Sequence, residues 1–306
     1  MLQEEAFVCL QDNFVGYKET VMKNIIVLIV VCILLTACLI SLLVCHRRRE
    51  GYNQTIAVYG ANFGGYRNEI SKQKLTDCAR DRTVDYFFYT DQEDLECQGW
   101  KMRYPDKLPG DHIMDSNRWM SKATKWKVPD ELRSYDIIVW IDSKLFPMNY
   151  TRSTVLDMLT MYPDKELFIL EHPYGRQTSL GEMHETVSRG MENRSNKVEE
   201  FYNKLSDFKD PIPLADTCQL IMKNSPELLR MLEIVFETLK HFELKRDQCV
   251  FNYALVQSGY PASKVCITSN MPIKRPVSNA HKGVFQKTRD AEKKVIRDIT
   301  SAKLEN

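Results

Sequence analysis

Residues 135–145, YDIIVWIDSKL, decide the fold class of this 306-residue chain. Five of the six residues from Ile137 to Asp142 are apolar, which predicts a buried strand, and the sixth is an aspartate. A carboxylate directly after a buried strand is a chance ending, a helix cap or a ligand for a charged group. The rest of the sequence has to separate these three interpretations.

Four other segments also read as strands, and helix-like segments lie between and after them. The strands are expected at 55–65 (TIAVYGANFGG), 84–91 (VDYFFYTD), 166–173 (ELFILEHP) and 213–224 (PLADTCQLIMKN). Helices are expected at 118–127, 151–161, 225–242 and 246–257, and 178–205 is charged and helix-permissive. This alternation predicts an α/β domain with a mostly parallel sheet covered by helices on both faces.

Two acids follow strands in this reading, Asp91 and Asp142. In open α/β sheets, ligands bind outside the carboxyl ends of the strands. Two separate strands that each bring a carboxylate to that edge indicate a binding site more strongly than either strand alone.

An apolar segment precedes the folded domain. Ile25–Cys45 contains 21 residues without a charge or a proline, and HRRR follows it at 46–49. A helix of this length spans about 30 Å, the thickness of the bilayer's hydrocarbon core. We therefore expect a single transmembrane helix at 24–45 that acts as a signal-anchor, with the lipid bilayer as a partner.

The side of the membrane on which the large domain lies is left open by the sequence. The basic residues at 47–49 favour a cytoplasmic domain. The glycosylation patterns that begin at Asn149 and Asn193 favour a lumenal domain in a Golgi-type or ER-type membrane. We expect the Golgi or ER membrane, with a cytoplasm-facing domain as the alternative.

The chain divides into five parts. We expect an N-terminal tail at 1–23, the transmembrane helix at 24–45, a basic stem at 46–54, the folded domain at 55–275, and a C-terminal tail at 276–306 with a basic amphipathic stretch that fits a helix. The formal net charge is only +1, which gives no indication of a nucleic-acid partner. The nine cysteines match no zinc-binding spacing and are expected to be mostly buried apolar side chains, with one or two disulfides among them.

Several common enzyme signatures are missing. The glycine loop at 60–65 is not a dinucleotide fingerprint, because Asn62 stands where the second glycine is required. The sequence contains no G-K-[ST] phosphate loop and no G-x-S-x-G elbow. His184 begins HETVSR, which lacks the second histidine of a zinc-protease helix.

One remaining chemistry fits an acid at a strand end in a membrane-anchored α/β domain. A nucleotide-sugar donor leaves negative charge on its diphosphate, and a divalent cation held by carboxylates neutralises that charge. Glycosyltransferases often supply the carboxylates as Asp-x-Asp. Here the triplet is Asp142-Ser143-Lys144, so either Mn²⁺ or Mg²⁺ is held by fewer protein ligands or no metal is used, and Lys144 itself can face phosphate.

Several stretches together resemble one known family. They are YFFYTD (86–91), KATKWKVPDELRSYDIIVWIDSKL (122–145), EHPYGRQTSLGE (171–182), LADTCQLIMKN (214–224) and RDQCVFNYAL (246–255). In their order and spacing they resemble the plant turgor-regulation-defect and mucilage-related glycosyltransferase-like family. The resemblance implies a GT-A-like fold, a nucleotide-diphosphate sugar donor and a glycan or glycoprotein acceptor.

The resemblance and the chemistry together suggest roles for the acids and for one histidine. Asp91 is expected near the base or ribose of the nucleotide, and Asp142 at the metal or diphosphate. Asp247 is expected against the sugar or as the base for the acceptor hydroxyl, although an acid there also favours a helix N-terminus. His172 is expected to bind the metal or the donor sugar; a structural histidine is the alternative.

The basic and amide side chains are expected to bind the donor. Lys122, Lys125 and Lys144 are expected to contact phosphates, although Lys122 and Lys125 also fit a solvated helix face. Arg176 is expected to hold a phosphate or an acceptor hydroxyl, or else to be a surface arginine, and Gln248 is expected beside Asp247.

We therefore expect a membrane-anchored glycosyltransferase. The first alternative is a catalytically silent protein that binds a nucleotide sugar or a glycan on the same fold, and the missing second acid favours it. A nucleotidyltransferase is the second alternative.

Overall fold

The computed structural model describes residues 29, 31–41, 54–79, 81–106, 116–146, 150–173, 177–192, 195–269 and 271. The chain divides into two compact units, Met1–Asn53 and Gln54–Asn306. The second unit starts one residue before the expected domain boundary at Thr55. The predicted C-terminal stretch at 276–306 lies outside the residues described.

The first unit contains a helix at 31–41, whose apolar side chains are exposed. Among the residues described, no helix combines the length and the apolar character needed to cross a bilayer. Most of the remaining residues of the predicted span at 24–45 lie outside the described ranges.

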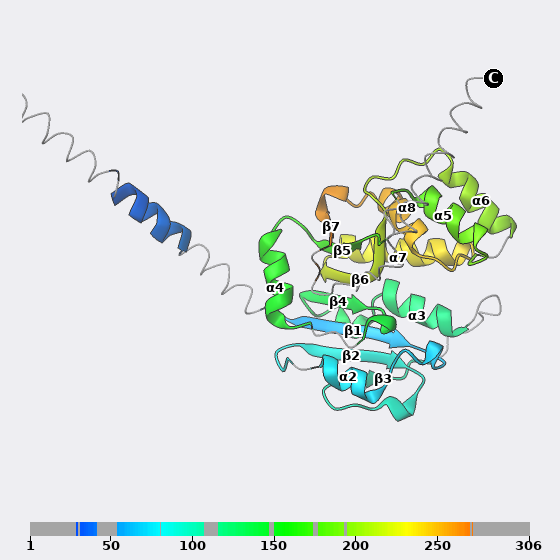
Figure 1. The fold of residues 1–306 in the computed structure, drawn as a ribbon, viewed down its shortest axis with the longest axis horizontal. Helices are drawn as coiled ribbons and strands as arrows, with labels where there is room; N and C mark the ends of the chain where they lie inside the picture. Colours follow the sequence, from blue (N-terminus) through cyan, green and yellow to red (C-terminus); the bar gives the residue numbers. More distant parts are fainter. Residues whose placement is uncertain are drawn as a thin grey trace, which may run out of the picture. The chain divides into compact units, whose positions relative to one another are not determined.

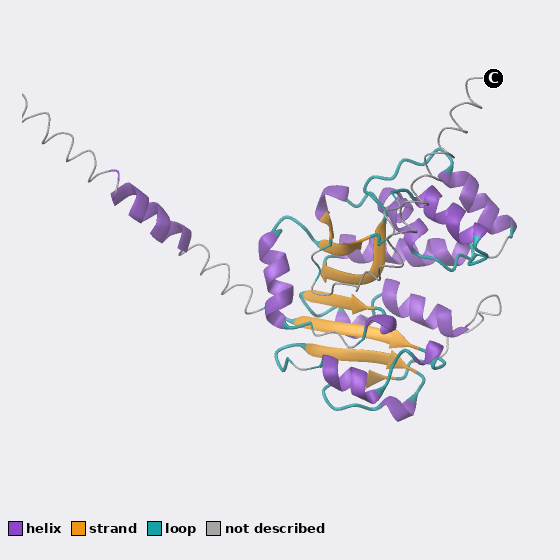
Figure 2. Ribbon diagram, viewed as in Figure 1, coloured by secondary structure: helices purple, strands orange, loops and turns teal. Residues whose placement is uncertain are grey.

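The second unit is built on a seven-stranded sheet (Figures 1 and 2). In spatial order the strands are β3 (Lys101–Arg103), β2 (Asp85–Thr90), β1 (Ile56–Asn62), β4 (Ile137–Ile141), β6 (Ala215–Lys223), β5 (Leu167–Glu171) and β7 (Val265–Thr268). All neighbouring pairs are parallel except those made by β6, which is antiparallel to both β4 and β5. The predicted α/β class with a mostly parallel sheet is confirmed.

Helices cover both faces of the sheet, as predicted. The helices are α2 (Lys72–Cys78), α3 (Ser116–Trp126), α4 (Arg152–Met161), α5 (Ser179–Ser188), α6 (Asn196–Leu205), α7 (Pro226–His241) and α8 (Gln248–Ser258). Along β1, Ala57 and Tyr59 pack on the face covered by α3 and α5 to α8, whereas Ile56 and Val58 pack on the face covered by α2 and α4. Because successive side chains of a strand point to opposite faces, two apolar layers require nearly continuous apolar strands.

Capping residues explain where several helices begin. Ser225 precedes Pro226 at the start of α7, and its hydroxyl accepts a hydrogen bond from the Leu228 N–H. Thr178 and Ser195 cap α5 and α6 in the same way. The helix-permissive segment at 178–205 therefore forms two helices, separated where Gly190 adopts a φ of 67°.

None of the five cysteines of the second unit forms a disulfide: Cys78, Cys97, Cys218, Cys249 and Cys266. All except Cys97 are buried. The expectation of mainly buried, small apolar side chains is therefore confirmed for this unit, whereas the expected disulfides are not formed in it.

Gly60 allows β1 to lie close to the end of β4. A Cβ atom at this position would lie 2.8 Å from the Ile141 carbonyl oxygen and 3.2 Å from the Phe146 ring. β1 is bonded to β2 on one side and to β4 on the other, so it cannot move away without straining both ladders. We expect Gly60→Ala to lower the free energy of unfolding by about 1–3 kcal/mol.

Urea unfolding of the full-length chain, followed by tryptophan fluorescence, tests this expectation. All four tryptophans lie in the second unit, so the signal reports on that unit alone. Val256→Ala on the exposed side of α8 serves as the control and should change stability by less than about 0.5 kcal/mol. A Gly60→Ala variant as stable as the control would show that the crowding is relieved without cost.

Candidate functional site

A cavity of about 460 Å³ opens at the carboxyl ends of β1 and β4. Its walls come from segments that are far apart in the sequence: the ends of β1 and β4, the start of β6, helix α3, Gly190 and Met191 after α5, and the loop that leads into α8. The start of β6 lies at this edge because β6 runs antiparallel to β4. The cavity therefore lies at the sheet edge where α/β domains bind ligands.

Asp142 lies at the end of β4, where the sheet ladder stops. Its backbone N–H still donates a hydrogen bond of 2.9 Å to the Cys218 carbonyl of β6. Its own carbonyl accepts a hydrogen bond of 2.9 Å from the Leu145 N–H, at the end of the short turn Ser143–Leu145. Its side chain is 27% exposed and accepts a hydrogen bond of 2.8 Å from Nε1 of Trp140. Lys144 Nζ lies 3.2 Å from Oδ2 of Asp142.

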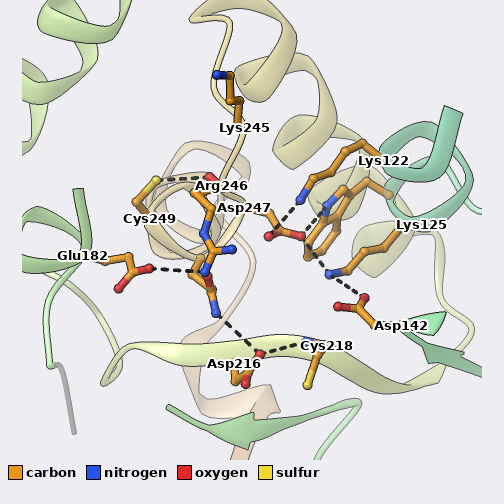
Figure 3. A network of polar contacts seen from close by, with 12 residues as sticks. Lys122, Lys125, Asp142, Glu182, Asp216, Cys218, Lys245, Arg246, Asp247 and Cys249 are labelled. Atoms are coloured by element: carbon orange, nitrogen blue, oxygen red, sulfur yellow. Dashed lines mark hydrogen bonds and ion pairs between the residues drawn. The ribbon is translucent and has the colours of Figure 1, made fainter. Parts of the chain in front are cut away.

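Asp247 lies at the other side of the cavity, immediately before α8, and is buried. Its Oδ1 lies 2.9 Å from Lys122 Nζ, and its Oδ2 lies 2.8 Å from Lys125 Nζ. Trp126 Nε1 also donates to Oδ2, at 3.2 Å. Three side chains of α3 therefore converge on this one carboxylate (Figure 3).

Lys125 connects the two acids. Its Nζ lies 2.8 Å from Oδ2 of Asp247 and 3.8 Å from Oδ1 of Asp142, and its side chain is only 4% exposed (Figure 3). The ammonium also lies 4.6 Å from the ring centroid of Trp126 and 5.9 Å from that of Trp140. The alternative of a solvated helix face does not hold for Lys125, since its ammonium is buried between two carboxylates and two tryptophan rings.

The lysines determine the protonation of both acids. Burial alone would raise the pKa of Asp247, but Lys122 and Lys125 hold it well below its usual range. Burial likewise favours a raised pKa for Asp142, yet the charges of Lys125 and Lys144 keep it below the ordinary value. Burial lowers the pKa of Lys122, and the ion pair with Asp247 offsets only part of that effect. Both carboxylates are therefore ionised at neutral pH.

Six of the predicted site residues line the cavity: Lys122, Lys125, Asp142, Lys144, Asp247 and Gln248. They come from three separate regions of the sequence, and the structure brings them together. Gln248 is buried, and its amide lies 3.5 Å from Oδ1 of Asp216.

Asp91 does not line this cavity. It is exposed, and its Oδ1 accepts a hydrogen bond of 2.8 Å from the Gly64 N–H. Gly64 has a φ of 65°, and a Cβ there would meet the amide of Asn117 on α3. In the structure, Asp91 thus fixes the glycine loop that follows β1.

His172 is buried after β5 and does not line the cavity. Its Nε2 lies 3.6 Å from the carboxylate of Glu182, which is completely buried on α5. This environment favours the structural alternative for His172 over a metal ligand. Arg176, the remaining predicted residue, lies outside the described ranges.

Other wall residues were not predicted as site residues. Asp216, at the start of β6, is 1% exposed, and its Oδ1 accepts from the Cys218 N–H at 3.1 Å. Asp216 is the one acid in the predicted strand LADTCQLIMKN, which is a signal that the sequence does contain. Arg118, Lys245 and Arg246 have no such signal, because single basic residues in polar segments usually lie on the surface.

Buried acids hold the loop that carries Asp247. The Glu192 carboxylate accepts backbone hydrogen bonds from Lys245 at 2.9 Å and from Arg246 at 2.6 Å. Arg246 also lies 3.9 Å from the carboxylate of Glu182 (Figure 3). These contacts fix the backbone that leads into α8, and with it the position of Asp247.

Basic residues outnumber acids in the cavity wall. The wall contains the basic residues Arg118, Lys122, Lys125, Lys144, Lys245 and Arg246 and the acids Glu69, Asp142, Asp216 and Asp247. Converging cations in a recessed site attract anions and raise their local concentration. The chemistry of the cavity therefore favours an anionic ligand.

The side chains at the site do not fit a divalent cation. Within the described ranges, no group of three or more His, Cys, Asp or Glu side chains is placed to hold a metal ion. The expected pair of ligands, Asp142 and His172, is not assembled, because only Asp142 lines the cavity. The described residues therefore offer no set of ligands for Mn²⁺ or Mg²⁺, and the expectation of a metal ion stays a prediction.

Neither a protein-family model nor a curated protein matches the chain. The resemblance to the plant glycosyltransferase-like family therefore stays a prediction.

Solved structures give low-scoring similarities. Mouse xyloside xylosyltransferase 1 is 11% identical, with a TM-score of 0.35, over 70% of this chain and 84% of that chain. The 4-diphosphocytidyl-2C-methyl-D-erythritol synthase from Anaerococcus prevotii is 10% identical, with a TM-score of 0.39, over 77% and 99%. Glucosyl-3-phosphoglycerate synthase from Mycobacterium tuberculosis is 18% identical, with a TM-score of 0.32, over 71% and 84%. Since all three TM-scores lie below 0.5, none of these similarities carries an argument for the function of this chain.

Proposed function

We propose that this protein is a membrane-anchored glycosyltransferase that moves a sugar from a nucleotide-diphosphate donor to a glycan or glycoprotein acceptor. The observation that carries the proposal is the cavity at the carboxyl ends of β1 and β4, where lysines surround Asp142 and Asp247. A diphosphate carries the negative charge that this basic wall attracts. The volume of the cavity, about 460 Å³, is typical of sites that bind small molecules.

The lysines suit the charge that develops during sugar transfer. As the bond between the sugar and the diphosphate breaks, negative charge grows on the departing phosphate oxygen. Ammonium groups that are already fixed by carboxylates stabilise that charge without reorganising. We assign phosphate contacts to Lys122, Lys125 and Lys144, with Asp142 and Asp247 as the residues that position them.

Asp247 is a weak candidate for the base that activates the acceptor. A general base works best when its pKa lies near the operating pH, whereas the pKa of Asp247 is held well below its usual range. Asp216 also lines the cavity, and its Oδ1 accepts hydrogen bonds from the Cys218 N–H at 3.1 Å and from the Gln248 amide at 3.5 Å. We propose that Asp216 orients the donor sugar or the acceptor through its carboxylate.

A donor screen tests the proposed function. The full-length chain, purified in detergent, is incubated with a panel of nucleotide-diphosphate sugars, and the release of nucleotide diphosphate is measured together with binding by calorimetry. We expect at least one donor to bind, and its parent nucleoside without phosphates to bind at least ~10-fold more weakly, because charge-assisted contacts to phosphate are lost. Addition of a glycan acceptor should accelerate release.

The same screen distinguishes the alternatives. A donor that binds without any release would favour a catalytically silent binding protein, which the ion pair between Lys144 and Asp142 in place of a second acid also favours. Release of a sugar 1-phosphate in place of a nucleotide diphosphate would indicate a nucleotidyltransferase, because breaking the bond between the two phosphates transfers the nucleoside monophosphate. No binding of any donor would contradict the proposal.

Location in a Golgi or ER membrane belongs to the same proposal, and the apolar run Ile25–Cys45 supports it. A mass shift that is removed by glycosidase treatment of the expressed protein would show that the large domain is lumenal.

A further inference from the structure

We infer that lysine ammonium groups, rather than a divalent cation, neutralise the diphosphate in this cavity, so that ligand binding is independent of metal. The inference rests on the proposed function and specifies the chemistry of its site. It follows from how the oxygens of the two central carboxylates are already used.

The oxygens of Asp247 are both engaged within the protein. Oδ1 pairs with Lys122 at 2.9 Å, and Oδ2 pairs with Lys125 at 2.8 Å and accepts from Trp126 at 3.2 Å. Both lysines are largely buried, at 16% and 4% side-chain exposure. A metal ion bound to Asp247 would have to displace these buried ammonium groups, which would separate Lys122 from this carboxylate and leave Lys125 with only Asp142 at 3.8 Å; removing such a buried counter-charge is costly.

The oxygens of Asp142 are engaged in the same manner. Oδ1 accepts from Trp140 at 2.8 Å and lies 3.8 Å from Lys125 Nζ, and Oδ2 lies 3.2 Å from Lys144 Nζ. Lys125 thus lies between the two acids, where a cation bridging them would have to bind (Figure 3). A fixed positive charge is already present at that point.

Lys144 explains the altered Asp-x-Asp pattern. It stands at the position of the second acid, and its ammonium lies beside the first acid, Asp142. Its side chain is 42% exposed, so it can reach a ligand in the cavity while Lys125 remains fixed behind it. Compared with Asp-x-Asp, a lysine at this position removes one metal ligand and adds one phosphate-binding cation. Both differences favour phosphate binding without a metal ion.

In the resulting step, the bond from the anomeric carbon to the β-phosphate oxygen breaks while a bond from that carbon to the acceptor oxygen forms. The acceptor hydroxyl loses its proton to a base or to solvent. The nucleotide diphosphate departs with the bonding electron pair, and Lys122, Lys125 and Lys144 compensate its negative charge.

Inorganic pyrophosphate is a suitable probe, because it tests the diphosphate site without knowledge of the nucleotide or sugar. Its binding to the full-length chain is measured by calorimetry, once with EDTA and once with excess MnCl₂ and no chelator. We expect binding in EDTA, with a Kd within about 3-fold of the value in Mn²⁺ after correction for the metal–pyrophosphate complex. Lys144→Met should weaken binding in EDTA by at least ~10-fold, and Lys144→Arg should restore most of it.

Lys204→Met on α6 is the matched control, because Lys204 has a similar side-chain exposure of 43% and lies beside an acid, Glu200. It should leave pyrophosphate binding unchanged. Binding that requires Mn²⁺ and is lost in EDTA would overturn the inference and leave the proposed function standing. The absence of binding in both conditions, for pyrophosphate and for all nucleoside diphosphates, would overturn both. Equal weakening by Lys144→Met and Lys204→Met would also overturn the inference, because it would reflect overall charge alone.

Discussion

Replacing Asp142 by asparagine is expected to reduce sugar transfer by at least ~100-fold while the domain remains folded, because misplacing a charged group by about 1 Å is enough for such a loss. Asparagine retains an oxygen to accept the Trp140 hydrogen bond, but it removes the charge that holds Lys144 and helps to hold Lys125. The two ammonium groups would then no longer be directed at the diphosphate.

The stability of this variant should change little. Asp142 is 27% exposed, Lys144 is 42% exposed, and Lys125 keeps its closer partner, Asp247. Loss of such partly exposed pairs costs at most about 1 kcal/mol.

Steady-state release of nucleotide diphosphate, combined with thermal unfolding, measures both effects. Asp130→Asn is the control, because its side chain is 96% exposed and its partner Arg133 lies on the surface. Transfer by Asp142→Asn at the rate of this control would refute the assignment of the site.

Asp247→Asn is expected to have the largest effect on stability, lowering the free energy of unfolding by about 3–5 kcal/mol. Asparagine leaves the buried ammonium of Lys122 without its counter-charge and leaves the buried ammonium of Lys125 with only its more distant partner, Asp142 at 3.8 Å. Urea unfolding at neutral pH, followed by tryptophan fluorescence, measures the loss.

A second variant separates lost pairing from a general disturbance of α8. Adding Lys122→Met to Asp247→Asn removes the ammonium that has lost its counter-charge, and it should recover part of the lost stability. A loss below about 1 kcal/mol for Asp247→Asn, or no recovery in the double variant, would contradict the account.

The difference between the wild type and Asp247→Asn should depend on pH in a definite direction. Because the pKa of Asp247 is lowered in the folded state, its ionised form stabilises the fold fully above the unfolded-state pKa, about 3.9. This stabilisation is lost as pH falls through the folded-state pKa. Plotted against pH, the free energies of unfolding of the wild type and of Asp247→Asn should therefore converge in acid and stay well separated at neutral pH.

The strands and most helices were predictable because local signals determine them. The apolar run Ile137–Ile141 and the alternation of Ile56 and Val58 produce two buried faces, and Ser225 with Pro226 marks the start of a helix. The strands β3 and β7 were missed, since runs of three and four residues contain too little pattern to detect. Strand direction is also not encoded in the alternation of side chains, so the antiparallel placement of β6 was not predicted.

By itself, the sequence determined the α/β class and the place of Asp142 at the end of a buried strand, because both follow from the pattern of apolar residues along the chain. Only the tertiary structure decided that Lys125 and Asp247, which are 122 positions apart, form one ion pair, and that His172 and Asp91 lie away from the cavity. The physical reason is that a charge is stable inside the protein only beside a counter-charge, and chain packing determines which charges meet.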